Sequence, residues 1–225
     1  MTDTTAVEEA EAQPRDERRE ALLAALTSEL GDVLVASHIV PGQDLWIRVT
    51  REAWVDTFRM LQTKHRLQFF DFLSAIDWMP SPFGREMDSA VDNEVYGKPE
   101  REPEPMTHGY TGGDTRFQLL ARVNNVVDHW GIIVKCDVPD DDLVVDTLVP
   151  VYAGANWHER EVREMFGIEF AGHPDPRHIY LPTEFEGFPL RKDFPLLARR
   201  VKPWPGIVDV EPMPGEDEGD EGGEG

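Results

Sequence analysis

The sequence predicts an α+β fold, a single mixed-sheet domain with flanking helices and a long extended C-terminal arm. Amphipathic helix patterns and short apolar strand patterns are both present, but they do not alternate in the regular order of a parallel βαβ sheet. From Glu169 onward, glycine and proline recur every few residues, which indicates an extended segment. With 225 residues, of which 40% are hydrophobic, the chain can bury one good core but not two large ones.

The first part of the expected domain contains one helix and two strands. Leucines recur at every fourth position up to Leu30, and Gly31 follows them as a stop signal, so an amphipathic helix is expected there. Short apolar runs over 33–37 and 45–49 predict strands on either side of a proline-glycine turn.

A second helix is expected after Thr50, whose side chain can cap it. Its apolar face comprises Trp54, Phe58 and Leu61. The aromatic run over 67–78 is too short for a long helix, and we interpret its core as a strand or a helix-to-strand passage.

The second half of the domain is expected to add a hairpin and two more helices. Apolar runs over 117–125 and 129–138 are separated by a hairpin-like spacing. The segment 139–142 has the acids and proline of a helix start, which the apolar stretch 143–151 continues. A last helix over 156–166 is closed by Gly167.

Composition divides the chain into a core and acidic extensions. We expect a disordered leader over 1–14, an α+β core over 15–168 that contains a long acidic loop over 79–115, a partner-binding arm over 169–210 and a disordered tail over 211–225. The formal net charge of −22 is concentrated in the leader, the loop and the tail.

The charge excludes several classes of partner. An acidic chain with no basic stripe repels phosphate backbones, so we expect no nucleic-acid binding. No run approaches the roughly 18–20 apolar residues of a membrane span, so we expect no direct membrane insertion. The N-terminus lacks the layout of a secretory or mitochondrial signal, which predicts a cytoplasmic chain. The single cysteine, Cys136, lies in an apolar run and is expected to be a small buried strand residue.

The charges of the helix over 156–166 have two interpretations. Glu159 and Arg163, like Arg160 and Glu164, stand four residues apart, which is typical of a solvated helix face covered by weak ion pairs. The other interpretation starts from the arm, because a loop on a small domain cannot cover all of its large apolar residues. Prolines stiffen this segment, and we expect it to lie in a groove of another protein. The large apolar residues of the arm are Phe170, Ile179, Tyr180, Leu181, Phe185, Phe188, Leu190, Phe194 and Leu196.

The same region resembles the thirty-kilodalton family, also named the C subunit, of respiratory complex I, the NADH:quinone oxidoreductase. The resemblance covers roughly residues 22–196 and includes FDFLSAIDW and GANW upstream; at Arg163, family members often carry an aromatic residue. The residues that carry it are Glu159-Arg160-Glu161, Glu164-Met165-Phe166-Gly167-Ile168, Gly172-His173-Pro174-Asp175 with Arg177, Glu186-Gly187 and Pro189-Leu190-Arg191-Lys192-Asp193.

The resemblance implies a bacterial, actinobacterial scaffold subunit with no catalytic, cofactor-binding or metal-binding residues of its own. Partner subunits would hold FMN and the Fe–S clusters that pass electrons from NADH to a quinone, which we take to be menaquinone. The partners would be other peripheral-arm subunits of complex I, chiefly the D subunit and also the B and I subunits. These would hold the chain on the cytoplasmic side of the cell membrane. The implied interface residues are Glu159, Arg160, Glu161, Glu164, His173, Pro174, Arg177, Phe188, Arg191, Lys192 and Asp193.

Two other functions remain open on the sequence. A similar subunit occurs in membrane-bound hydrogenases and other complex I-like dehydrogenases, and neighbouring genes for a flavin-bearing NADH-oxidising subunit would distinguish complex I from these. A free-standing soluble metalloenzyme is the more distant alternative. The chain contains the acidic residues and histidines that a metal site needs, but not at the required spacing. Val162 stands where the HExxH motif needs its second histidine.

Overall fold

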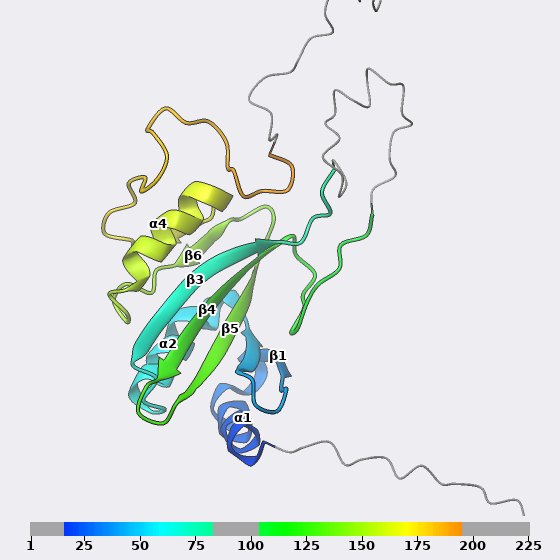
Figure 1. Ribbon diagram of the computed structural model, residues 1–225, viewed down its shortest axis with the longest axis vertical. Helices are drawn as coiled ribbons and strands as arrows, with labels where there is room; N and C mark the ends of the chain where they lie inside the picture. The colour runs from blue at the N-terminus through cyan, green and yellow to red at the C-terminus, as the bar shows by residue number, and fades with distance from the viewer. Residues whose placement is uncertain (1–15, 83–103, 195–225) are drawn as a thin grey trace, which may run out of the picture.

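The computed structural model describes residues 16–82 and 104–194, and a five-stranded mixed sheet forms its centre (Figure 1). The sheet has the order β1-β2-β5-β4-β3; its pairs are antiparallel except β2–β5, which is parallel. Its strands are β1 (Leu34–His38), β2 (Leu45–Val49), β3 (Phe69–Asp77), β4 (Phe117–Asn125) and β5 (Trp130–Val138). The helices are α1 (Glu17–Leu30), α2 (Trp54–Thr63) and α4 (Ala155–Phe166), with 3₁₀ turns η1 (Gly31–Val33) and η2 (Arg51–Ala53). The α+β prediction with a mixed sheet is confirmed.

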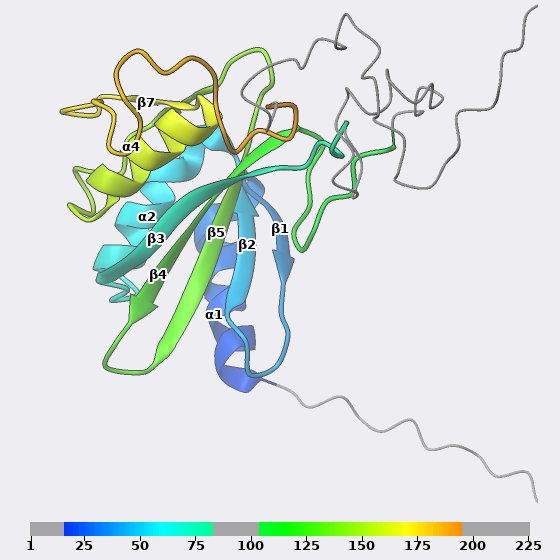
Figure 2. The same cartoon turned by 45° about the horizontal axis from the view of Figure 1, so that its top comes forward.

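The core lies between one face of the sheet and the helices α1 and α2, which lie behind the strands in Figure 2. Alternate residues of β2 are buried, as the period of a strand requires when only one face meets the core. The predicted face of α2 is confirmed, because Trp54, Phe58 and Leu61 are all fully buried. Cys136 is likewise fully buried on β5, and burial raises the pKa of its thiol above the ordinary value.

The other face of the sheet is partly covered by the segment 104–115. Tyr110 stacks on His38 with ring centroids 4.2 Å apart, and its carbonyl oxygen accepts a 2.7 Å hydrogen bond from Nζ of Lys135. Lys135 is 1% exposed, and burial lowers its pKa to about 8. The described parts of the expected acidic loop, 79–82 and 104–115, contain no helix or strand; its middle lies outside the described residues, as do the leader and the acidic tail.

The predicted helix over 143–151 is wrong. The chain there forms the short strand β6 (Val144–Asp146), which pairs in parallel with β7 (Glu169–Ala171) as a second sheet. Val145 is buried opposite Phe170, and a β-branched pair of valines favours this pleated arrangement over a helix.

Thr50 also differs from expectation, because it stands before η2 and its side chain makes no capping hydrogen bond.

Within the described ranges, no helix is both long enough and apolar enough to cross a membrane.

Candidate functional site

Of the arm expected over 169–210, the structure describes 169–194: its first residues form β7, and 172–194 return across α4 to the end of the central sheet (Figures 1 and 2). Phe170 in β7 is buried, whereas Tyr180 and Leu190 are 63% and 51% exposed. The remaining predicted anchors are partly covered, and Leu196 lies outside the described residues. The arm therefore uses much of its apolar surface against its own domain, which sequence reasoning did not expect.

Glu164 holds the middle of the arm from the buried side of α4. Its carboxylate accepts hydrogen bonds from the backbone N–H groups of Ile179, Tyr180 and Leu181, with the Ile179 bond at 3.0 Å. Burial raises the pKa of this carboxyl, but the three backbone donors and His178 together outweigh burial and hold the pKa below its ordinary value. A carboxylate that satisfies three donors of an irregular segment replaces the hydrogen bonds that a helix or sheet would supply.

Arg160 and Arg163 also bind the arm's backbone. Nε and Nη2 of Arg160 donate to the carbonyl oxygens of Arg177 and His178 at 2.7 and 3.0 Å. Nη1 of Arg163 donates to the carbonyl of Pro176 at 3.0 Å, and its Nε pairs with Glu169 at 2.8 Å. The predicted ion pairs along the helix are therefore wrong, because the charged groups take partners in the arm and in β6–β7 instead.

Glu159 is fully buried and faces the second sheet. Its carboxylate accepts a 2.6 Å hydrogen bond from the backbone N–H of Leu148 and another from the hydroxyl of Thr147. Burial raises the pKa of Glu159 to about 7, although both hydrogen bonds act against the rise. The interpretation of Glu159 as a solvated helix charge is therefore wrong, and this residue joins α4 to the turn after β6.

His173 lies beside Glu159, with Nε2 3.9 Å from the nearest carboxylate oxygen. Nε2 faces the carbonyl oxygen of Asn156 at 3.0 Å, and Nδ1 accepts from the backbone N–H of Asp175 at 3.0 Å. These two bonds fix the start of the arm against α4. Arg177, by contrast, is exposed and pairs with Asp175 two residues away.

Two other predicted interface residues make no such contact. Pro174 is exposed, and Glu161 is partly exposed on α4. In the portions of the chain that the structure describes, the Glu161 carboxylate has no hydrogen-bond or ion-pair partner. Neither residue takes part in holding the arm.

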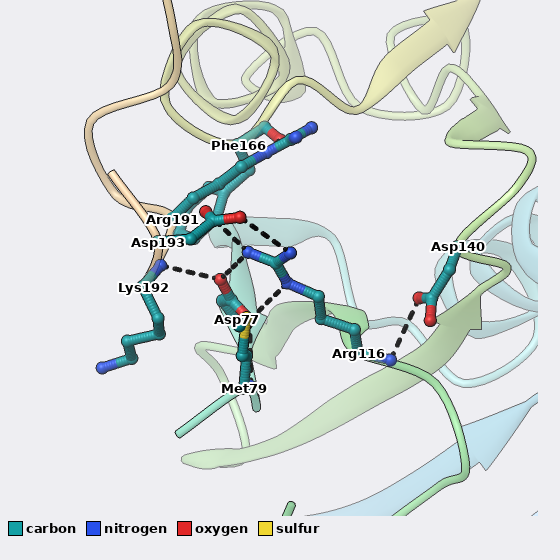
Figure 3. A network of polar contacts seen from close by, with 8 residues as sticks. All are labelled: Asp77, Met79, Arg116, Asp140, Phe166, Arg191, Lys192 and Asp193. Carbon is teal, nitrogen blue, oxygen red and sulfur yellow. Dashed lines mark hydrogen bonds and ion pairs between the residues drawn. The ribbon is translucent and has the colours of Figure 1, made fainter. Parts of the chain in front are cut away.

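The end of the arm is held by an ionic cluster at the end of β3 (Figure 3). The Arg116 guanidinium donates two hydrogen bonds to Asp77, at 2.8 and 3.0 Å, and two more to Asp193, at 2.9 and 3.1 Å. Asp77 also accepts from the backbone N–H of Lys192 at 2.8 Å and of Met79 at 3.0 Å. We call Asp77, Arg116 and Asp193 the Asp77 cluster.

The two carboxylates of this cluster differ in environment. The Asp77 side chain is fully buried, whereas that of Asp193 is 44% exposed. The hydrogen bonds between Arg116 and the two carboxylates, Asp77 first, raise the pKa of Arg116, and its bonds to Asp193 lower the pKa of that carboxyl. Arg116 and Asp193 therefore both stay ionised at neutral pH.

Arg191 and Phe188 complete this contact. The Arg191 guanidinium lies over the rings of Phe188 and Phe117 at 4.3 and 5.1 Å, and its Nε donates to the carbonyl of Phe166 at 2.6 Å. Gly167 has a left-handed φ of 74°, and a Cβ there would lie 2.6 Å from both Arg191 and Phe188. Glycine is required at this position both to end α4 and to admit the arm.

Three residues of this site were missed by sequence reasoning, namely Asp77, Arg116 and Thr147. Asp77 and Arg116 stand at the end of β3 and just before β4, and such flanking charges are usually solvated. The only local signal was a charged residue directly bordering a strongly apolar strand. In the described ranges, no group of three or more His, Cys, Asp or Glu side chains is arranged to hold a metal ion.

This arrangement can position a segment, because its buried carboxylates and guanidinium groups are bound to backbone atoms and to one another. Seven of the eleven predicted interface residues, joined by Asp77, Arg116 and Thr147, fix the arm or the second sheet within the chain. Those seven are Glu159, Arg160, Glu164, His173, Phe188, Arg191 and Asp193.

Comparison with known proteins assigns the chain to a family. Residues 47–200 match the family model described as "Respiratory-chain NADH dehydrogenase, 30 Kd subunit". An Azoarcus protein that is named as the C subunit of NADH-quinone oxidoreductase is 31% identical over 198 residues, which are 86% of each chain. A Yersinia pestis protein, whose name gives it as the joined C/D subunit of NADH-quinone oxidoreductase, is 33% identical over 139 residues, which are 62% of this chain and 22% of that protein.

Coverage varies among the relatives. The chain spans about half the length of two other curated relatives that carry the C-subunit name, at 46% and 47% of those proteins. Among solved structures, a chain of the membrane-bound sulfane sulfur reductase, an archaeal respiratory membrane complex, has the same fold, with a TM-score of 0.57 and 19% identity over 80% of this chain and 88% of that one. The match to the family model and the similarity to the C-subunit relatives show that the chain belongs to the family of the 30-kDa subunit of respiratory-chain NADH dehydrogenase.

Proposed function

We propose that this chain is the non-catalytic scaffold C subunit of a proton-translocating NADH:quinone oxidoreductase. The observation that carries the proposal is the use of the family's charged residues: Glu164, Arg160 and the Asp77 cluster bind the chain's own arm. Groups that fully satisfy one another have little capacity left for acid–base chemistry. They instead hold an irregular segment in one shape, which is what a scaffold presents to its neighbours.

The cofactors and substrates belong to the partners in this proposal. FMN and the Fe–S clusters are carried by other subunits, and electrons pass from NADH through them to a quinone, which we take to be menaquinone. Cys136 is the single cysteine of the chain, whereas an iron–sulfur cluster is commonly bound by four.

The D subunit is the proposed principal neighbour, and the B and I subunits are further ones. The support is the Yersinia pestis relative, whose printed name joins C and D in one protein, because two subunits that function as one chain must lie close together. These partners hold the chain at the cytoplasmic side of the cell membrane.

Trp157 marks the surface that we assign to a partner. It is 69% exposed on α4, in a part of the domain next to the arm. Exposed tryptophans contribute disproportionately to protein interfaces, because a rigid ring buries a large area at small entropic cost. Tyr180 and Leu190 of the arm, which lies across α4, are also large apolar side chains that are exposed.

Replacing Trp157 with alanine is expected to reduce assembly. We expect a loss of about 2 kcal/mol of binding free energy, or about 30-fold in affinity, with no loss of melting temperature because the ring packs on little of its own domain. Assembly is measured by the amount of the D subunit, flavin and NADH:quinone reductase activity recovered with the affinity-tagged chain.

Val127→Ala is the matched control, because Val127 is 77% exposed in the turn between β4 and β5, at the opposite end of the domain. It should assemble normally. Equal recovery with both variants would contradict the assigned surface. Recovery of hydrogenase subunits in place of a flavin-bearing NADH-oxidising subunit would contradict the proposed parent complex.

A further inference from the structure

A cavity of about 220 Å³ lies at the end of the domain opposite to the arm. It opens between the first turn of α1, the connection from α2 to β3 and the turn between β4 and β5, which lie together away from α4 in Figures 1 and 2. Its walls are formed by Arg18, Arg19, Leu22, His65, Arg66, Asn125, Asp128 and Trp130. None of these residues takes part in the arm contacts.

The cavity gathers basic groups in a strongly acidic chain. Arg18 pairs with Asp128 at 3.6 Å, and His65 pairs with Glu29 at 2.8 Å. Arg66 differs from both, because across residues 16–82 and 104–194 its guanidinium has no hydrogen-bond or ion-pair partner. Arg66 is exposed where it lines the cavity, so its guanidinium is solvated and open to an anionic ligand.

Arg19 adds an unpartnered donor to the same wall. Its Nη1 pairs with Asp16, but its Nε is buried and, within the described part of the chain, has no acceptor. Nε has almost no accessible surface, so it is not itself a contact atom for a ligand, and Arg19 contributes positive charge to this wall.

The backbone of Arg66 is also costly. Its φ is +59°, and it follows the end of α2 at a place where glycine is the favoured residue. Retaining an arginine in a left-handed conformation costs stability, and such positions are concentrated at functional sites. The left-handed backbone lowers the stability of the fold, and the side chain of Arg66 lines the cavity.

The shape and lining restrict the ligand. Leu22 and Trp130 provide apolar walls, so the ligand has an apolar body as well as a charge. The volume of about 220 Å³ is below the roughly 300–1,000 Å³ of sites for drug-sized molecules. We propose that this cavity binds a small organic anion, whose carboxylate or phosphate oxygens contact the guanidinium of Arg66 and whose apolar body lies against Trp130.

Benzoate is a suitable probe, because it combines a carboxylate with a compact ring. In a titration of the isotopically labelled full chain, we expect saturable amide shifts confined to 18–22, 65–67 and 125–130. Benzyl alcohol, which has the ring without the charge, and inorganic phosphate, which has a charge without the ring, should each bind at least about tenfold more weakly.

Arg66→Gly separates binding from folding. Glycine removes the cation and relieves the left-handed backbone, so we expect the affinity for benzoate to fall at least about tenfold while the melting temperature stays equal or rises. Arg59→Gln is the control, because Arg59 lies exposed on α2 and pairs with Asp56 three residues away; its affinity should stay within about twofold.

Three outcomes would overturn the proposal. They are the absence of saturable shifts at these amides, an unchanged affinity in Arg66→Gly, and phosphate binding as tightly as benzoate, which would indicate an adventitious ion only.

Discussion

Replacing Asp77 with alanine is expected to lower the free energy of unfolding by about 3–5 kcal/mol, because it leaves the largely buried Arg116 without its main partner. The change also removes the acceptor for the backbone N–H groups of Lys192 and Met79. Urea denaturation of the full chain measures the loss. Limited proteolysis should show faster cleavage within 172–194 in the variant, because the end of the arm is no longer held to β3.

Asp193→Ala is the matched control for this prediction. Asp193 pairs with the same guanidinium, but its side chain is 44% exposed, so solvent screens the pair and we expect a loss of only about 1 kcal/mol or less. In the double variant Asp77→Ala with Arg116→Met, part of the Asp77→Ala loss should be recovered, because no unpaired buried cation remains. Equal losses in Asp77→Ala and Asp193→Ala would contradict the assignment of Asp77 as the buried centre of the cluster.

The second large effect concerns the pH dependence of stability and Glu159. Its pKa is raised to about 7, from an ordinary value of 4.5. Between these two values the folded chain binds a proton that the unfolded chain has released, so this residue makes stability fall as pH rises toward 7. A shift of this size corresponds to about 3 kcal/mol. Above pH 7 the free energy of unfolding is lower by this full amount than it would be without the pKa shift.

Glu159→Gln tests that sign. The amide cannot ionise, yet its oxygen can still accept from the N–H of Leu148. We therefore expect the variant to gain about 3 kcal/mol relative to the parent chain between pH 5 and pH 8, measured by urea denaturation at both values. Glu161→Gln, two residues away on α4 and partly exposed, should show no such change, and a parallel gain in both variants would contradict the buried-carboxyl explanation.

Glu159 and Glu164 show the limit of predicting ion pairs from the spacing of charges along a helix. Glutamate and arginine four residues apart predicted ion pairs along the helix, and this was one of two interpretations that the sequence left open. Both carboxylates are buried, at 0% and 3% exposure, and both bind backbone N–H groups. Backbone donors of a distant segment leave no periodic signal, so helix spacing could not reveal them.

The prediction of a helix over 143–151 was wrong for a related reason. An apolar stretch after acids and a proline satisfies the rules for a helix start, but the same residues can pair as a strand when a partner strand is present. That partner is β7, more than twenty residues later in the chain. Long-range pairing decides the secondary structure of such short apolar segments, because the free energy of local preference is smaller than that of burial against a partner strand.

Residue patterns alone were enough to predict the α+β class, the helices α1, α2 and α4, four strands of the central sheet and the glycine that ends α4, because each depends on apolar periodicity or on a local backbone preference. They left β3 open between a strand and a helix-to-strand passage. The second sheet, the course of the arm over α4 and the Asp77 cluster became visible only in the folded chain. The course of the arm and the cluster depend on polar groups that are fifteen or more residues apart. A buried carboxylate is stable only where the folded chain brings donors to it, and no local pattern records which donors they are.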